Sequence, residues 1–402
     1  MSPPRIGIWF IGARGGVATT ATLGLIALQK QLTDSIGLVS SLRQFDRLDF
    51  APWGSFVVGG HEIREGTVTE AIERLHAESH VFDARVIAAC HDELSAIDAR
   101  IRPGTLANCG TTIGGLAGSD MQKFATESSM ATVERLKSDL REFKKQAAVD
   151  QVLVVNLAST EPANDGLKLP ERWDELAKCV DNKSPCSLPA SSLYAIAALD
   201  SGLPYINFTP SLGSSPAAIQ DLAVERGACH AGQDGKTGET LLKSVLAPMF
   251  AARNLEVMSW VGHNIFGNLD GLVLDDPANK AAKVKNKDQL VGSILGYEPQ
   301  SLVSIEYIRS LGDWKTAWDH IHFRGFLGTP MSLQLTWQGC DSLLAAPLVL
   351  DLVRFVELSQ RQGETGLLSH LGSFFKRPLG LKEHDFSRQF SLLCEWAERH
   401  SA

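Results

Sequence analysis

Residues 5–31 have the order strand, glycine-rich turn, helix, and this order limits the possible folds more than any other feature. Residues 5–11 are apolar and β-prone, residues 12–20 contain the glycines, and residues 21–31 have a helical pattern. Apolar runs continue to alternate with helical patterns as far as about residue 240. Because parallel strands need long crossovers, usually helices, this alternation predicts an α/β protein built on a doubly wound parallel sheet.

The pattern changes after about residue 240, where extended runs largely replace the alternation. We therefore expect an inserted α+β domain over residues 241–344, within a first domain made of residues 1–240 and completed by residues 345–402. The expected strands are residues 5–11, 35–40, 56–58, 151–156, 204–208, 257–261, 301–307 and 332–337, and the expected helices are residues 21–31, 68–76, 130–146, 193–199, 239–253 and 343–358.

The composition excludes several classes of protein. Lys and Arg number 38 against 46 Asp and Glu, a formal net charge of −8, so no nucleic-acid partner is expected. No apolar run reaches 18 residues, and we expect no membrane span. The seven cysteines form no CxxC pair, which argues against a disulfide framework or a zinc ribbon and favours a reducing, cytoplasmic location, and the eleven histidines form no HExxH motif.

The glycine turn has a spacing that suits a dinucleotide. The motif Gly12-x-x-Gly15-x-x-Ala18 lies between a strand and a helix, where backbone N–H groups approach a pyrophosphate. The motif is imperfect, because Arg14 occupies the position of a middle glycine. The alternative is an ordinary strand-to-helix turn. The expected cofactor-binding residues of the turn are Gly12, Ala13, Arg14, Gly15, Gly16 and Val17.

Glu62 is the expected ligand of the adenosine ribose. Such a carboxylate usually follows the turn by about 20 residues, and Glu62 comes later than that, after the apolar run at residues 56–58. A carboxylate that holds the ribose hydroxyls should repel a 2′-phosphate and favour NAD over NADP. The alternative is a solvated loop acid.

A second glycine-rich loop, residues 232–240, contains Gly235-Lys236-Thr237, which resembles the end of a P-loop. The glycine that a P-loop requires five residues before Gly235 is replaced by His230, so nucleotide hydrolysis is not expected. A glycine-rich loop that opens a helix still binds anions well. The alternative is a loop with a threonine cap.

Lysines and amides mark the remaining segments of interest. Lys315 follows Trp314, and Lys376 lies beside two phenylalanines. Neighbouring like charges repel unless an anion is present, and a lysine in an apolar pocket exchanges protons near neutrality. Four further lysines, Lys280, Lys283, Lys285 and Lys287, form a cluster within eight residues. The alternative for the clustered lysines is a solvated basic face, and the alternative for Lys376 is a snorkelling surface side chain. The segment before the cluster contains Asn264, Asn268 and Asp270, whose side chains suit either sugar hydroxyls or turn caps.

Taken in order, these segments resemble the myo-inositol-1-phosphate synthase family over nearly the whole chain. The matching stretches are GARGGVATT, FVVGGHEI, VDQVLVVNLASTE, LPYINFTPS, AGQDGKTGET, HNIFGNLDG, the KAAKVKNK lysines, GDWK, CDSLLAAPLVLDL and FFKRPL. The resemblance implies a Rossmann-like NAD-binding domain, an inserted catalytic and tetramerisation domain, and a homotetramer. It also implies cyclisation of glucose 6-phosphate to inositol 3-phosphate by internal oxidation, enolisation, aldol closure and re-reduction, with NAD not consumed.

The resemblance further assigns roles to residues of this chain. The implied catalytic residues are Lys283, Lys376, Lys315, Lys287, Asp234, Asp270 and Asn264. The implied cofactor contacts beyond the glycine turn and Glu62 are Ala158, Ser159, Thr160 and Asp341. The substrate phosphate, which carries about −1.5 to −2 charges, is expected at Thr237, Gly238, Lys287 and Lys315. Lys283 and Lys376 are expected to stabilise the oxyanion and to shuttle protons.

The chain departs from the family at several positions. Ala282, Val284 and Asn286 replace serines around the lysine pair, Cys340 replaces an acid, and residues 14–17 replace an asparagine-rich turn. These changes leave open the exact sugar phosphate and the need for a divalent or monovalent cation. Two alternatives therefore remain: an NAD-dependent enzyme for a different sugar phosphate, and a non-catalytic protein that binds NAD or a sugar phosphate.

Overall fold

The computed structural model describes residues 4–124, 126–162, 167–181, 188–274 and 290–401. The strands are β1 (Ile6–Ile11), β2 (Phe56–Glu62), β3 (Ile101–Pro103), β4 (Gln151–Asn156), β5 (Tyr205–Asn207), β6 (Cys229–Gly232), β7 (Glu256–Phe266), β8 (Gln300–Tyr307), β9 (Trp314–Arg324), β10 (Pro330–Cys340) and β11 (Gly366–Leu367). The helices are α1 (Gly16–Gln29), α2 (Val68–Ser79), α3 (Ala84–Ala89), α4 (His91–Asp98), α5 (Thr111–Gly114), α6 (Ser129–Gln146), α7 (Trp173–Asp181), α8 (Ala190–Asp200), α9 (Ala217–Glu225), α10 (Gly238–Ala252), α11 (Leu269–Leu274), α13 (Asp341–Arg361) and α14 (Phe386–His400).

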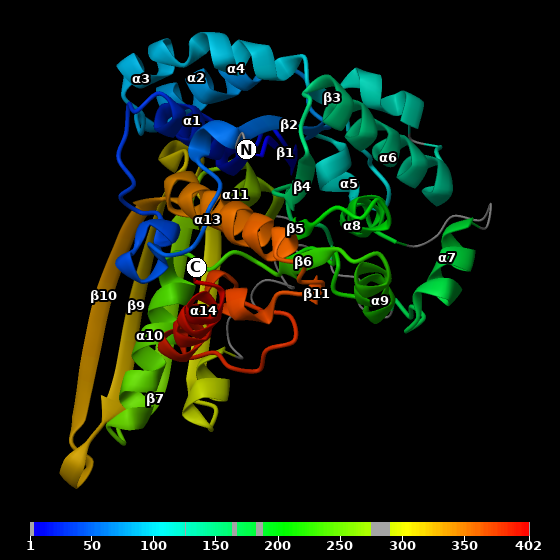
Figure 1. Cartoon of the computed structure of the whole chain (residues 1–402). Helices are drawn as coiled ribbons and strands as arrows, with labels where there is room; N and C mark the ends of the chain where they lie inside the picture. Colours follow the sequence, from blue (N-terminus) through cyan, green and yellow to red (C-terminus); the bar gives the residue numbers. More distant parts are fainter. Residues whose placement is uncertain (1–3, 125, 163–166, 182–187, 275–289, 402) are drawn as a thin grey trace.

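Seven parallel strands form the larger sheet, in the order β11-β6-β5-β4-β1-β2-β3. β1 pairs with both β2 and β4, so the sheet grows first to one side of β1 and then to the other. Helices cover both faces of this sheet (Figure 1). The order and the covering helices are those of a Rossmann-like doubly wound sheet, and this part of the predicted fold is confirmed.

β1 explains why a continuous apolar run forms a buried parallel strand. Ile6, Ile8 and Phe10 belong to the core cluster shared with α1, α13 and α14, whereas Trp9 and Ile11 belong to the cluster shared with α6 and α8. Successive side chains of a strand point to opposite faces, and both faces of this sheet are covered. All positions of β1 are therefore apolar or glycine, and every one is buried.

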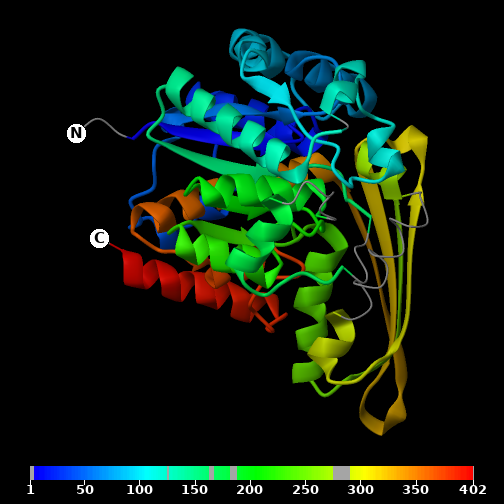
Figure 2. The same cartoon turned by 90° about the vertical axis from the view of Figure 1, so that its right-hand side faces the viewer.

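Four strands form a second, mixed sheet in the order β10-β9-β7-β8. β9 runs antiparallel to β7 and β10, whereas β8 runs parallel to β7. α10 packs on one face of this sheet, where Phe250 and Trp260 lie in a small separate core. Figure 2 shows the four strands as a long layer beside the larger sheet. The change of pattern after residue 240 thus predicted a second sheet correctly.

The predicted strand at residues 35–40 is wrong. Residues 39–41 form a 3₁₀ turn, and Gly37 has a φ of +91°. The N–H groups of Val39 and Ser40 donate to the buried carboxylate of Asp351 on α13, at 2.7 and 2.8 Å. A side chain distant in sequence thus satisfies donors that a neighbouring strand would otherwise pair. The patterns also did not predict the short strands β3, β6 and β11.

Two glycines let the turn after β1 approach its neighbours closely. At Gly60 on β2, an added Cβ would lie 2.3 Å from the carbonyl oxygen of Phe10 and 2.7 Å from the Cβ of Ala13. Gly12 has a φ of +79°, and an added Cβ there would lie 3.1 Å from the Cα of Ala158. These contacts are with backbone or with a methyl that cannot rotate away, so glycine is required at both positions.

We predict that Gly60→Ala lowers the free energy of unfolding by about 1–3 kcal/mol, because the methyl group overpacks the contact with Phe10. Gly54→Ala is the matched control, since nothing lies within 4 Å of a Cβ added there. Its effect should stay below about 1 kcal/mol. Urea unfolding measures both variants, and equal effects would contradict the assigned contact.

Candidate active site

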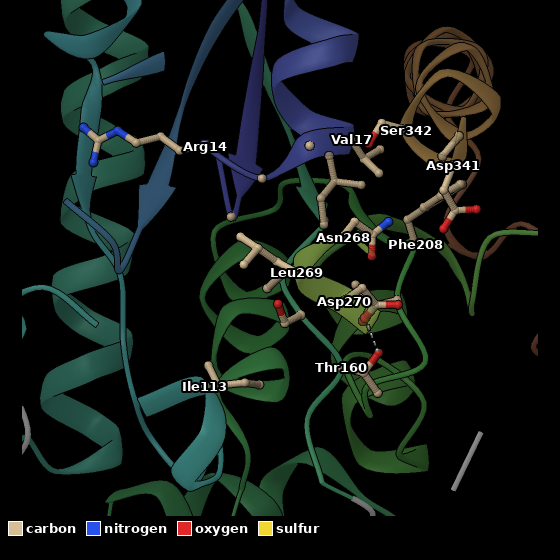
Figure 3. A pocket seen from close by; sticks show the side chains of 18 of the residues that line it. Arg14, Val17, Ile113, Thr160, Phe208, Asn268, Leu269, Asp270, Asp341 and Ser342 are labelled. Atoms are coloured by element: carbon tan, nitrogen blue, oxygen red, sulfur yellow. Dashed lines mark hydrogen bonds between the residues drawn. The ribbon is translucent and has the colours of Figure 1, made fainter. Parts of the chain in front are cut away.

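A cavity of about 970 Å³ opens at the carboxyl edge of the larger sheet. Its walls come from the segments that follow β1, β2, β4, β5 and β6, and from the loop between β7 and α11, the start of β9 and the start of α13. Figure 3 shows part of this lining, in which Thr160, after β4, faces Asp270, at the start of α11. Doubly wound sheets bind ligands at this edge, beside the point where the strand order reverses, which here is between β1 and β4.

The first turn of α1 offers a cradle for a pyrophosphate. Gly15 is its N-cap residue, no side chain caps the helix, and the first turn contains no acidic residue. The first N–H groups of a helix have no partner within it and form the positive end of its dipole. Ala13 is buried behind the turn. The other five predicted turn residues line the cavity: Gly12, Arg14, Gly15, Gly16 and Val17. These features fit a dinucleotide.

Glu62 ends β2 beside this turn and is 5% exposed. Its carboxylate accepts a hydrogen bond from the backbone N–H of Arg14 at 2.7 Å and forms an ion pair with Arg64 at 3.1 Å. Burial acts to raise the pKa of Glu62, but the charge and hydrogen bonds of Arg64 and the backbone outweigh it, and the pKa is lowered. Glu62 is therefore ionised, and it is already paired within the protein.

Lys376 and Asp234 meet in the cavity although 142 residues separate them. The Nζ of Lys376 donates to Oδ1 of Asp234 at 2.9 Å, and its backbone N–H donates to the Asp234 carbonyl at 2.6 Å. A β-bridge between Gly235 and Phe375 holds the two segments together. The side chains are 19% and 12% exposed. A lysine held in this way can donate a proton or stabilise an oxyanion.

Lys315 and Asp341 form a second lysine–aspartate pair in the same cavity. The Nζ of Lys315 lies 3.6 Å from Oδ1 of Asp341 and 5.0 Å from the ring centroid of Phe266. Asp341 is the first residue of α13, where Figure 3 shows it beside Ser342. Of the four predicted active-site lysines, Lys315 and Lys376 thus line the cavity, while Lys283 and Lys287 lie outside the described residues.

Asp313 is a buried polar centre to which the sequence analysis gave no role. Its carboxylate accepts hydrogen bonds from Asn268 at 3.1 Å, from the backbone N–H of Ser342 at 2.8 Å and from the thiol of Cys340 at 2.7 Å. Burial raises the pKa of Asp313. An added Cβ at Gly16 would lie 2.6 Å from Oγ of Ser342, so this cluster lies directly against the glycine turn.

The remaining predicted polar residues separate into two groups. The hydroxyl of Thr160 donates to Asp270 at 3.4 Å, and both line the cavity together with Ala158 and Ser159 (Figure 3). Asn264 is instead fully buried on β7, where its side chain donates to Glu239 at 2.6 Å, and it is absent from the described cavity lining. The catalytic role of Asn264 therefore stays a prediction.

The second glycine-rich loop opens α10 toward the cavity. Thr237 is the N-cap residue and lines the cavity, and its side chain makes no capping hydrogen bond. Gly238 follows with a φ of +54° and is buried. Glu239 in the first turn pairs with Lys243 at 2.7 Å, which neutralises the one acid near this helix end. The loop therefore remains suited to a phosphate.

The lysine of the Gly235-Lys236-Thr237 motif points away from the cavity. Lys236 is 3% exposed, and its ammonium group donates to Gln389 on α14 and lies 5.8 Å from the ring centroid of Phe386. Burial lowers the pKa of Lys236 to about 7. The motif thus places the N-terminal end of α10 at the cavity, whereas its lysine side chain binds the loop to α14.

Glu161 is a second buried group that sequence reasoning missed. It lines the cavity, is 7% exposed and accepts hydrogen bonds from the N–H and hydroxyl of Ser191, at 2.8 and 2.5 Å. Burial raises the pKa of Glu161 to about 7. Because Ser191 lies in the first turn of α8, Glu161 ties the predicted cofactor contacts at residues 158–160 to that helix.

The described residues contain no group of three or more His, Cys, Asp or Glu side chains arranged to hold a metal ion. No helix in the described parts of the chain is both long and apolar enough to cross a membrane. His320 and His322 both lie on β9.

The sheet order, the uncapped first turn of α1 and the two lysine–aspartate pairs define a Rossmann-like protein with a dinucleotide cradle and a basic site for an anionic ligand. Such a combination is that of a nicotinamide-dependent enzyme. The chain belongs to the myo-inositol-1-phosphate synthase family, whose model matches residues 6–398.

Individual relatives agree with this assignment. Inositol-3-phosphate synthase 1 of Bacteroides thetaiotaomicron is 33% identical over 98% of this chain and 93% of the relative. Inositol-3-phosphate synthase 1 of Oryza sativa subsp. japonica is 29% identical over 89% of this chain and 75% of the relative. Inositol-3-phosphate synthase of Caenorhabditis elegans shares the fold, with a TM-score of 0.84 at 22% identity over 100% of this chain and 86% of that one.

We predict that Lys236 makes stability depend on pH. The unfolded chain keeps this proton up to a pH of about 10.5, whereas the folded protein releases it above about 7. The unfolded state therefore binds more protons in this window, and stability rises with pH. In Lys236→Met this rise is lost, so the free energy of unfolding of the variant minus that of the wild type should fall by about 2–4 kcal/mol from pH 7 to 10.

Denaturant unfolding at several pH values measures this difference. Lys382→Met is the matched control, because Lys382 is exposed. Its difference from the wild type should not change with pH in this window. A constant difference for Lys236→Met as well would show that Lys236 is charged in the folded protein.

Proposed function

We propose that this protein is an NAD-dependent inositol-3-phosphate synthase that cyclises D-glucose 6-phosphate to 1L-myo-inositol 1-phosphate. The observation that carries the proposal is the Lys376–Asp234 pair, which faces the same cavity as the uncapped first turn of α1. Membership of the family and the names of its relatives support the substrate and the product.

In this proposal the ammonium group of Lys376 stabilises, or donates its proton to, the sugar oxygen on which negative charge develops. Asp234 holds the ammonium group in place through the 2.9 Å hydrogen bond. Positive charge at a developing oxyanion lowers the barrier most when it is already oriented. Asp270, which accepts from Thr160, orients sugar hydroxyls. Lys283 joins this task by the family resemblance.

We assign the substrate phosphate to the positively charged groups of the same cavity. Thr237 and Gly238 present the N-terminal end of α10, and Lys315 presents an ammonium group. Because Glu239 is paired with Lys243, no unpaired acid in the first turn of α10 opposes the phosphate. Lys287 completes the proposed set by the family resemblance.

The turn at residues 12–17 and the first N–H groups of α1 are assigned to the cofactor pyrophosphate, with residues 158–160 and Asp341 as further contacts. When bound, NAD supplies a hydride acceptor that later returns the hydride, so the net reaction is an isomerisation. The walls of the cavity come from both sheets, so the substrate and the cofactor can meet in it.

Incubation of the purified protein with glucose 6-phosphate and NAD tests the proposal. Inositol phosphate formed without net NADH establishes the cyclase, as judged by the phosphorylated products and the NADH absorbance band. Accumulating NADH points to an enzyme for a different sugar phosphate, and cofactor binding without turnover points to a non-catalytic binding protein. Assays with EDTA, Mg²⁺ or NH₄⁺ test the cation.

We predict that Lys376→Ala and Lys283→Ala each lower kcat by at least about 100-fold, because each removes the positive charge proposed to act on the substrate. Steady-state kinetics measures the loss, and thermal unfolding verifies that the variants are folded. Lys382→Ala is the matched control, since Lys382 is exposed, and its kcat should be unchanged. Near-normal turnover in both active-site variants would refute these catalytic assignments.

We further propose that residues 241–344 form the catalytic and tetramerisation domain inserted between residues 1–240 and 345–402, and that the protein is a cytoplasmic homotetramer. β7 pairs Val261 with Leu302 and His263 with Trp318. These residues share the face opposite Trp260, which packs against α10. Leu302 and Trp318 are 53% and 43% exposed, which supports this face as the contact between copies.

We predict that Trp318→Asp converts a tetramer into smaller species, because it places a charge in the proposed apolar contact. Sedimentation velocity measures the assembly. Ile36→Asp is the control, since Ile36 is 88% exposed and lies outside the second sheet. A tetramer that is unaffected by Trp318→Asp would place the contact elsewhere.

A further inference from the structure

The adenosine end of the proposed cofactor site contains two arginines that change what the site can accept. Arg14 lies in the glycine turn, and Arg64 lies two residues beyond Glu62. Both line the cavity, with side chains 17% and 21% exposed. In a Rossmann-like site, an acid at the end of the second strand holds the ribose 2′-hydroxyl, whereas a nearby arginine accommodates a 2′-phosphate.

Glu62 is occupied by the protein itself. Its Oε1 accepts from the N–H groups of Ile63 and Arg64, at 2.9 and 3.1 Å, and from Nε of Arg64 at 3.2 Å. Its Oε2 accepts from the N–H of Arg14 at 2.7 Å and from Nη2 of Arg64 at 3.1 Å. A carboxylate offers about four lone-pair sites, so these five hydrogen bonds saturate it. Glu62 thus works as a clamp between the turn and Arg64.

Arg64 keeps one edge of its guanidinium group available. Nε and Nη2 donate to Glu62, and Nη1 has no hydrogen-bond partner among the described residues. The orientation is fixed by the two-point contact with a buried carboxylate, so little freedom is lost when the other edge binds a phosphate.

Arg14 compensates the charge of Asp98, which is the second acid of this region. Its Nη2 lies 3.5 Å from Asp98, and its Nη1 donates to the carbonyl of Arg64 at 2.8 Å. Figure 3 shows its side chain extending away from Asp270 and Asp341, the other end of the cavity. Arg74 and Glu78 on α2 also line the cavity and carry opposite charges. The two acids nearest to Arg64, Glu62 and Asp98, are therefore each paired with an arginine.

We propose that the adenosine end of the cavity accepts a 2′-phosphate on Arg64, so that the protein binds NADP as well as NAD. This inference rests on the proposed dinucleotide site and revises the expectation that Glu62 excludes NADP. Charge repulsion is one reason why a ribose-binding acid disfavours a 2′-phosphate, and here the ion pair with Arg64 offsets that repulsion.

Calorimetric titration with two cofactor fragments tests the inference without turnover. 5′-AMP and adenosine 2′,5′-bisphosphate differ only in the 2′-phosphate, and NAD and NADP differ by the same group. The bisphosphate should bind the wild type within about tenfold of 5′-AMP or more tightly. In Arg64→Gln, the affinity for the bisphosphate relative to 5′-AMP should fall at least about tenfold, because a bidentate charge-assisted contact is lost.

Two further variants make the result specific. Arg64→Lys keeps the charge and should recover part of the affinity ratio. Arg85→Gln makes the same change in net charge at a side chain that is 91% exposed, and its ratio should equal that of the wild type. Thermal unfolding verifies that each variant is folded.

The outcomes separate this inference from the proposed function. Binding of 5′-AMP and NAD together with rejection of the bisphosphate and NADP by the wild type would overturn the inference alone. An unchanged ratio in folded Arg64→Gln would overturn the role of Arg64. Failure of all four compounds to bind would overturn the dinucleotide site, and with it both proposals.

Discussion

The buried carboxylate of Asp313 joins the two sheets at the point where the cavity forms. It accepts from Asn268 before α11, from Cys340 at the end of β10 and from Ser342 at the start of α13, and it lies two residues before Lys315. Ser342 in turn lies against the glycine turn, since a Cβ added at Gly16 would be 2.6 Å from its Oγ. These buried hydrogen bonds help to fix the distance between the cofactor cradle and Lys315 on the second sheet, since they leave little room for displacement.

Several carboxylates in and around the cavity are paired with a lysine or an arginine. Glu62 is paired with Arg64, Glu239 with Lys243 and Asp234 with Lys376. Breaking such a pair is costly, because it leaves one charge desolvated and alone. Each pair also removes a negative charge that would oppose a phosphate. The N-terminal ends of α1 and α10, which face the cavity, are then free to bind anions through their first N–H groups.

Much of the fold follows from local pattern. The continuous apolar runs of β1 and β4 can be buried only between two helical layers, and the glycine turn can only precede a helix. The residues of the Lys376–Asp234 pair were also identifiable, although only through resemblance to a family, because nothing in their own surroundings marks them as neighbours. The strand expected at residues 35–40 failed because Asp351, far along the chain, satisfies its N–H groups.

The sequence by itself determined the alternation of elements, the helix-opening glycine loops and the family, because these depend on residue type and spacing within a few turns of chain. The tertiary structure alone decided which charges are compensated. Lys236 belongs to an anion-binding motif by sequence, yet it is buried against α14, and Glu62 is a ribose acid by position, yet it is saturated by Arg64 and the glycine turn. The protonation and availability of a side chain depend on burial and on partners from distant segments, which spacing along the chain does not specify.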